Sequence, residues 1–249
     1  MSEQAAQQTG QAVQAGRAGA GNQRPVALVT GGSRGIGKAV VADLAKDHHV
    51  IVGATTKENA EKVARECESA EVFVADLSDP EQLAAEFQRV FTDGARLDVV
   101  VHSAGIYAGG AVEELSHADW MRVLNLNVAA VAELTRLALP LLRASKGMVV
   151  TINSGSGFRA SPTTGAYAAS KFALRAFTDA LREEERGEVR VSSVHPGRVD
   201  TDMQVEIQGA EDYDGAKYVQ PASIAKAVRL SVDAGWDCNV DEVSVRPRA

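Results

Sequence analysis

The chain has 249 residues, of which 45% are hydrophobic, and carries a formal net charge of −7 at pH 7. An acidic chain lacks the clustered Lys and Arg with which proteins bind nucleic-acid phosphates, so we expect small-molecule partners and no nucleic acid. The sequence contains no run of about 18 apolar residues and no export signal, and its two cysteines, Cys67 and Cys238, indicate neither a disulfide framework nor a metal site. These features favour a cytoplasmic protein that binds no membrane and no metal.

The first 24 residues are rich in Gln, Ala and Gly and contain almost no large apolar side chains. Such a segment cannot bury enough apolar surface to offset the entropy that is lost on ordering. We therefore expect residues 1–24 to form a disordered tail, with a partner-binding arm as the alternative. Residues 25–249 are expected to form a single domain, because α/β folds of about 250 residues often remain undivided.

Seven short runs rich in β-branched residues follow the tail and alternate with helical patterns. Because these runs are almost wholly apolar, they predict strands buried on both faces, as in a parallel sheet covered by helices. The fold class is therefore α/β, with a doubly wound sheet that binds ligands at the carboxyl ends of its strands. The predicted strands lie at 25–31, 49–54, 71–77, 97–105, 147–154, 189–197 and 241–247. The predicted helices lie at 35–47, 57–69, 80–91, 112–143, with a break near Ser116 as an alternative, 167–186 and 221–234.

The first predicted strand ends in the glycine-rich stretch "TGGSRGIG", residues 30–37. Its glycines let the backbone turn tightly and approach a ligand, and the following helix directs its free N–H groups toward a phosphate. The spacing differs from the common G-x-G-x-x-G pattern, so a plain strand-to-helix turn is the alternative. The motif predicts a dinucleotide site.

A second motif, "YAASK", opens the predicted helix at 167–186. Tyr167 and Lys171 are four residues apart, so a helix places them on one face. A nearby cation lowers the pKa of a phenol, and the pair is therefore suited to proton transfer near neutral pH. The alternative is a partly buried tyrosine beside a surface lysine.

Taken together, "TGGSRGIG", "HSAG", Asn127, Ser154, "YAASK" and "HPGRVDT" resemble the short-chain dehydrogenase/reductase family in order and spacing. The resemblance covers about residues 25–247. It implies a Rossmann-like fold and an oxidoreductase that interconverts a carbonyl and an alcohol by hydride transfer to or from NAD(P)(H). The catalytic residues that it implies are Asn127, Ser154, Tyr167 and Lys171, whereas the nearby Asn125 and Ser156 stand at the wrong spacing.

The family resemblance also implies a role for each of these four residues. In the reductive direction, Ser154 would hydrogen-bond the substrate carbonyl and Tyr167 would donate the proton. Lys171 would lower the pKa of Tyr167 and hold the nicotinamide ribose, and Asn127 would position a chain of water molecules. The alternative is a catalytically silent dinucleotide-sensing or scaffold protein of the same fold.

The resemblance further implies a cofactor site built from the loops that follow the strands. Asp76 would meet the adenine amino group, although it is also suited to capping a turn. The implied cofactor-binding residues are Gly31, Ser33, Arg34, Gly35, Ile36, Gly37, Thr55, Thr56, Asp76, Leu77, Ala104, Gly105, Tyr167, Lys171, Pro196, Gly197, Val199 and Thr201.

NADP(H) is expected in preference to NAD(H). Relatives that use NAD carry a carboxylate at the end of the second strand, and Thr55 stands at that position. Arg34 matches the basic position of relatives that use NADP, Thr56 adds a hydroxyl, and Lys57 is a weaker candidate. A solvated loop arginine is the alternative for Arg34. The most specific expectation is an NADPH-dependent ketone or aldehyde reductase.

The sequence departs from the family pattern at residues 102–105, where His-Ser-Ala-Gly replaces the usual Asn-Asn-Ala-Gly. His102 is expected to be a structural residue. Residues 204–220 stand where relatives carry a variable substrate lid, and their composition suits a mobile flap.

The substrate pocket is expected to be lined by residues 106–112 and 155–162 and by the flap. Four aromatic residues suggest an apolar or aromatic substrate, although each is equally suited to packing: Tyr107, Phe158, Tyr213 and Tyr218. Many relatives associate through the two long helices, which correspond to 112–143 and 167–186, so a homodimer or homotetramer is expected.

Overall fold

A computed structural model describes residues 24–211 and 213–248, so the expected tail lies, apart from Arg24, outside the described residues. Seven parallel strands form one sheet in the order β3-β2-β1-β4-β5-β6-β7. This arrangement confirms the predicted doubly wound sheet. The strands are β1 (Val26–Thr30), β2 (His49–Ala54), β3 (Ala70–Val74), β4 (Val99–His102), β5 (Met148–Ile152), β6 (Arg190–Pro196) and β7 (Glu242–Val245).

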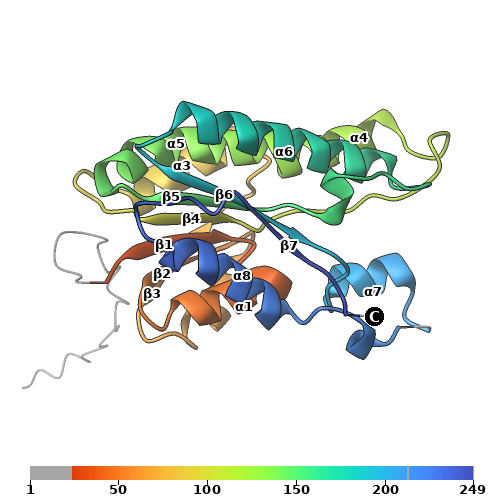
Figure 1. Ribbon diagram of the computed structural model, residues 1–249, viewed down its shortest axis with the longest axis horizontal. Helices are drawn as coiled ribbons and strands as arrows, with labels where there is room; N and C mark the ends of the chain where they lie inside the picture. The colour runs from red at the N-terminus through yellow and green to blue at the C-terminus, as the bar shows by residue number, and fades with distance from the viewer. Residues whose placement is uncertain (1–23, 212, 249) are drawn as a thin grey trace, which may run out of the picture.

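Helices cover both faces of the sheet, with α1 and α8 on one side and α3, α5 and α6 on the other (Figure 1). None of the helices in the described part of the chain is both long enough and apolar enough to cross a membrane. The helices are α1 (Gly35–Leu44), α2 (Lys57–Ala64), α3 (Pro80–Val90), α4 (His117–Leu124), α5 (Ala130–Ser145), α6 (Gly165–Glu184), α7 (Asp202–Gln208) and α8 (Pro221–Asp233).

Two hydrophobic cores lie on the two faces of the sheet, because successive strand residues point to opposite sides. In β1, Val29 packs in the core that includes Leu44 of α1 and Val228 of α8. Its neighbour Leu28 packs in the other core, which includes Leu134 of α5. Burial of both faces explains why the strands are almost wholly apolar, and it leaves the ends of the strands as the accessible parts of the sheet.

Helix boundaries are where the sequence-based prediction was least accurate. The helix expected at 112–143 begins at His117, because Ser116 and Asp119 form a capping box in which each side chain accepts the other residue's backbone N–H. A π-helical segment, Asn125–Ala129, then separates α4 from α5. The first two predicted helices end at Leu44 and Ala64, earlier than expected, and both continue as turns.

The segment 204–220, expected to be a flap, overlaps helix α7. Thr201 caps this helix by accepting a hydrogen bond from the backbone N–H of Gln204 at 3.3 Å. A 3-10 turn at Gly215–Lys217 follows. Figure 1 shows α7 set apart from the helices that cover the sheet, close to the C-terminal end of the chain. The segment is thus partly helical.

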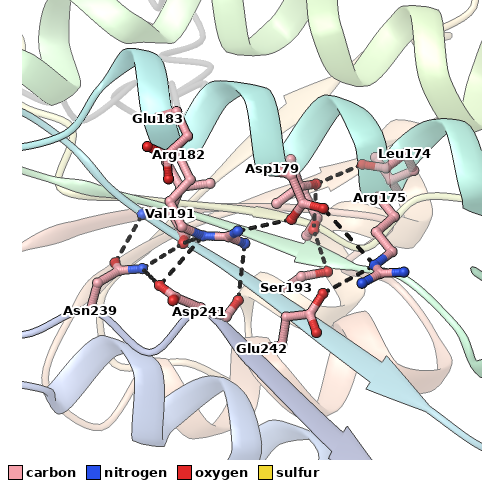
Figure 2. Close-up of polar contacts among 12 residues, drawn as sticks. Leu174, Arg175, Asp179, Arg182, Glu183, Val191, Ser193, Asn239, Asp241 and Glu242 are labelled. Carbon is pink, nitrogen blue, oxygen red and sulfur yellow. Dashed lines mark hydrogen bonds and ion pairs between the residues drawn. The ribbon is translucent and has the colours of Figure 1, made fainter. Parts of the chain in front are cut away.

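The edge of the sheet at β7 is joined to α6 and β6 by polar contacts (Figure 2). The Arg182 guanidinium donates to the carbonyl oxygens of Val191 and Asp241, at 2.9 and 3.1 Å. The Asn239 amide pairs with the Val191 peptide in both directions, at 2.9 and 3.2 Å. Arg175 forms an ion pair with Glu242 at 3.2 Å. These contacts fix the short strand β7 beside β6.

Candidate functional site

The loops that follow the parallel strands form one cleft at the carboxyl edge of the sheet. It consists of two adjoining cavities of about 260 and 430 Å³. We call the first the glycine-loop cavity and the second the Tyr167 cavity. They share five lining residues: Ile36, Ser103, Gly105, Thr201 and Met203. The cleft lies where the strand order reverses between β1 and β4, the usual position of a ligand site in such a sheet.

The glycine loop depends on the absence of side chains. Gly31 has a φ of +62°, and a Cβ there would lie 2.9 Å from the Cα and N atoms of Ala104. Gly35 also has a positive φ, of +53°. A Cβ on Gly37 would collide with the carbonyl oxygen of Gly31. The loop therefore packs directly on the backbone that follows β4, and the N-terminus of α1 opens on the cavity.

Most of the predicted cofactor residues line the glycine-loop cavity. Two of them line neither cavity: Gly37 packs beneath Gly31, and Thr56 caps helix α2 by accepting from the Asn59 N–H at 3.4 Å. The backbone cradle and the helix N-terminus beside it fit the phosphates of a dinucleotide. The predicted residues that line this cavity are Gly31, Ser33, Arg34, Gly35, Ile36, Thr55, Asp76, Leu77, Ala104, Gly105 and Thr201.

Two acidic residues also line this cavity. Asp76 is exposed, and its carboxylate accepts a hydrogen bond from the Ser78 N–H at 2.9 Å, so it stabilises a turn while facing the cavity. Asp202, which sequence reasoning missed, lies 3.9 Å from the guanidinium of Arg34. Both side chains of this pair are more than 70% exposed, at 78% and 75%, so their ion pair is weak.

The Tyr167 cavity contains three of the four predicted catalytic residues: Ser154, Tyr167 and Lys171. Ser154 follows β5, and its hydroxyl accepts a hydrogen bond from the Ser156 N–H at 3.1 Å. Its carbonyl oxygen accepts one from Nδ1 of His195 at 3.3 Å. The serine is thus held by the loop after β5 and by strand β6, and it lines the same cavity as Tyr167 on α6. The other predicted residues in this cavity are Pro196, Gly197 and Val199.

Burial dominates the electrostatics of Tyr167 and Lys171. It raises the pKa of the Tyr167 phenol above the ordinary value of 10.0, more than the hydrogen bond with Ser154 lowers it. It also lowers the pKa of Lys171 to about 8. The ammonium donates to the carbonyl oxygen of Ile152 at 3.0 Å and lies 5.7 Å from the centre of the Tyr167 ring. In this structure burial, and not Lys171, determines the direction of the Tyr167 pKa shift, so the expected lowering by Lys171 stays a prediction.

Asn127 lies in the π-helical segment, is 1% exposed and lines neither cavity. Its amide oxygen accepts from the Ile106 N–H, and its amide nitrogen donates to the Ile106 carbonyl and to the Ser170 hydroxyl, all at 3.0 Å. Asn127 therefore ties the loop after β4 to helix α6. Its role with water stays a prediction. Asn125 instead donates to the Ser78 carbonyl, on a separate part of the chain.

His102 is 3% exposed, and its Nε2 is 3.0 Å from the hydroxyl of Thr135. Burial lowers its pKa to about 3, so the ring is neutral at physiological pH. It lines neither cavity, as expected for a structural residue.

Only one of the four aromatic candidates for substrate contact, Tyr107, lines the Tyr167 cavity. Phe158 stacks on His195, with ring centres 4.4 Å apart. Tyr213 donates to Asp200 at 2.7 Å and contacts the ring of Tyr218. Polar residues from two loops and α7 also line this cavity: Ser156, Arg159, Ser161, Thr164, Arg198 and Gln204.

Residues 25–212 match the family model described as short chain dehydrogenase. Dehydrogenase/reductase SDR family member 11 of Bos taurus is 31% identical, with 89% of this chain and 95% of that protein covered. An uncharacterized oxidoreductase of Staphylococcus epidermidis is 30% identical, over 89% of this chain and 96% of its own length. The alcohol dehydrogenase of the archaeon Thermococcus sibiricus, solved in complex with 5-hydroxy-NADP, is 29% identical with a TM-score of 0.84, covering 91% of this chain and 97% of that one.

Gly31→Ala tests the backbone contact beneath the glycine loop. We expect it to lower Tm and to weaken dinucleotide binding at least tenfold, because the Cβ would clash with Ala104. Gly94→Ala is the matched control: its φ is +78°, but no atom lies within 4 Å of the added Cβ. The control carries only backbone strain of about 1–2 kcal/mol. Thermal unfolding measures the change in Tm, and fluorescence titration with NADPH measures the change in affinity. Equal NADPH affinity in the two variants would contradict the role of Gly31 in the dinucleotide site.

Lys171→Met tests the buried ammonium through the pH dependence of stability. The pKa of Lys171 is about 8 in the folded chain, and that of an unperturbed lysine is 10.5. Between pH 8 and pH 10.5 the unfolded chain therefore binds more protons than the folded chain. Wild-type stability should therefore rise with pH relative to the variant, by roughly 2–3 kcal/mol from pH 7 to pH 10. Urea unfolding measures this difference.

Lys57→Met is the control for this measurement, because the Lys57 side chain is 74% exposed. Its stability difference from wild type should not change with pH. The same flat result for Lys171→Met would show that the ammonium is not desolvated.

Proposed function

This chain belongs to the short-chain dehydrogenase family, and on that premise we propose that it is an NADPH-dependent reductase of ketones or aldehydes. The observation that carries the proposal is that Ser154, Tyr167 and Lys171 line one cavity, which adjoins the glycine-loop cavity. A donor pair for a carbonyl oxygen thus adjoins a cradle suited to a dinucleotide.

The glycine-loop cavity would hold the adenine and phosphate end of the cofactor, and Tyr167 and Lys171 would lie at its nicotinamide end. When bound, NADPH supplies the hydride that reduces the carbonyl carbon. The solved alcohol dehydrogenase of Thermococcus sibiricus, which was crystallised with 5-hydroxy-NADP, supports a nicotinamide dinucleotide as the cofactor.

Ser154 and Tyr167 would act on the substrate oxygen. The Ser154 hydroxyl binds the carbonyl oxygen and polarises it, and the Tyr167 phenol donates its proton as negative charge develops there. The raised pKa of Tyr167 keeps the phenol protonated at neutral pH. This protonation state favours reduction, because oxidation of an alcohol requires the phenolate as a base.

Lys171 and Asn127 would support this chemistry. Lys171 keeps a positive charge near the phenol as its proton leaves, and Asn127 holds the loop after β4, whose residues Gly105 and Tyr107 line the cavity. A panel of aldehydes and ketones with NADPH tests the proposal. Consumption of NADPH with at least one of them is expected, whereas tight NADPH binding without turnover would favour a sensor or scaffold protein.

Tyr167→Phe removes the proposed proton donor. Turnover should fall at least a hundredfold, the usual scale for a proton-transfer group, while Tm and NADPH affinity remain close to wild type. Tyr107→Phe is the matched control, because its ring lies 5.2 Å from that of Tyr167 and lines the same cavity. Steady-state kinetics decide: a Tyr167→Phe variant as active as the control would end the assignment.

Arg34→Ala tests the proposed NADPH preference. A charge-assisted bond to the 2′-phosphate contributes about 1.5–3 kcal/mol, so kcat/KM with NADPH should fall roughly ten- to a hundredfold and that with NADH should not change. Lys57→Ala is the control, because Lys57 pairs with Glu61 at 3.7 Å and lies outside both cavities. A wild-type preference for NADH, or equal losses with both cofactors, would refute the preference.

We propose further that the chain forms a homodimer through α4, α5 and α6. Two large apolar side chains on this side are exposed, Met121 at 47% and Phe172 at 44%, as a subunit contact requires. Phe172→Arg should therefore shift sedimentation toward the monomer. Leu230→Arg, on α8 at the opposite face of the sheet, should leave the sedimentation unchanged. If only this variant dissociated the dimer, the interface would be at α8 instead.

A further inference from the structure

We infer that the substrate carries an oxyanion, a carboxylate or a phosphate, in addition to its reactive carbonyl. This inference rests on the proposed function and concerns the same cavity. It is carried by two arginines and an amide that line the Tyr167 cavity and whose side chains make no hydrogen bond or ion pair with the described residues: Arg159, Arg198 and Gln204. The Arg198 guanidinium also lies over the ring of Tyr218, 5.6 Å from its centre.

Among the described residues, the Tyr167 cavity is lined by cations and by no acidic side chain. Arg159 follows the turn after β5, Arg198 follows β6, and both are exposed. Lys171 adds a third positive group at the inner end. In a chain with a net charge of −7, this is a local reversal of sign. Walls of a single sign raise the local concentration of a ligand of opposite charge.

Neither arginine has a carboxylate within 4.0 Å in the described part of the chain, whereas most of the other described arginines do. Arg136 and Arg186, for example, pair with acids three residues earlier in the chain. Asp200 stands between two lining residues, Val199 and Thr201, but does not line the cavity itself. Its carboxylate accepts a hydrogen bond from the hydroxyl of Tyr213 at 2.7 Å. The two guanidinium groups are therefore available to an anionic ligand.

Gln204 provides an independent observation. It lines the cavity from α7 and is only 8% exposed, yet its side-chain amide makes no hydrogen bond to any described residue. Its backbone N–H is used by the helix cap at Thr201. The N–H donors of the side-chain amide can therefore bind a ligand oxygen at this wall of the cavity.

These groups belong to the substrate end of the cleft and not to the dinucleotide end. Arg159, Arg198 and Gln204 line only the Tyr167 cavity, whereas Arg34 lines only the glycine-loop cavity. The oxyanion would therefore bind on the same side as Ser154 and Tyr167, and it would orient the carbonyl toward them. Because a guanidinium binds an oxyanion through two parallel N–H donors, the site would distinguish an acid from its neutral ester.

The test compares matched pairs of carbonyl compounds with NADPH: levulinate with methyl levulinate, acetoacetate with methyl acetoacetate, and dihydroxyacetone phosphate with dihydroxyacetone. We expect kcat/KM for an anionic member to exceed that of its neutral partner at least tenfold. The first two pairs report a carboxylate, and the third reports a phosphate. Equal values within all three pairs would overturn the inference while leaving the reductase intact.

Arg159→Ala and Arg198→Ala should each raise KM for the preferred anion about tenfold, while KM for NADPH and kcat/KM for the neutral partner stay unchanged. Arg159→Lys should recover part of the loss. Arg186→Ala, outside both cavities, is the matched control and should change nothing. Equal losses for the anionic and neutral members, or a rise in KM for NADPH alone, would overturn the inference.

If no compound in the panel consumes NADPH, the proposed reductase fails, and binding then decides the inference. Thermal unfolding with levulinate, methyl levulinate and dihydroxyacetone phosphate provides this readout. A rise in Tm with an anion, absent with the ester and lost in Arg159→Ala and Arg198→Ala, supports an oxyanion site. No rise with either anion overturns it.

Discussion

The backbone contact between Gly31 and Ala104 is the constraint on which the rest of the site depends. The loops after β1 and β4 leave adjacent strands, and they can lie against each other only because Gly31 has no Cβ. The contact places the N-terminus of α1 beside the loop that Asn127 ties to α6. The glycine-loop cavity and the Tyr167 cavity are continuous for this reason, and a ligand long enough to bridge them meets both.

Sequence reasoning recovered the sheet because strands buried on both faces leave an unambiguous apolar pattern, as in β1 and β4. It was less accurate at helix ends, where single hydrogen bonds decide: a continuous helix from residue 112 was weighed against a break near Ser116, and the Ser116 capping box agrees with the break. The start of α7 carried a signal that was overlooked, namely Thr201 three residues before Gln204. The pKa of Tyr167 had no such signal, because it depends mainly on the burial of the phenol in the folded chain.

The buried pair on α6 shows how the fold and the proposed chemistry oppose each other. Burial favours the neutral forms of both Tyr167 and Lys171, which holds the phenolic proton in place but makes the ammonium costly at neutral pH. The carbonyl oxygen of Ile152, at the end of β5, offsets part of that cost. Helix α6 thus retains a buried ammonium, which lowers stability, beside the phenol that would transfer a proton. Such a loss of stability is common at functional sites.

The Asn239 side chain determines how far the sheet extends at β7. By pairing with the Val191 peptide in both directions, it takes the place that a further strand residue would occupy, and β7 has only four residues. A long open edge exposes a row of unpaired peptide groups to which another chain can add a strand. The short edge beside Asn239, flanked by Asp241 and Glu242, offers little template for such addition and so protects the chain against aggregation through its sheet.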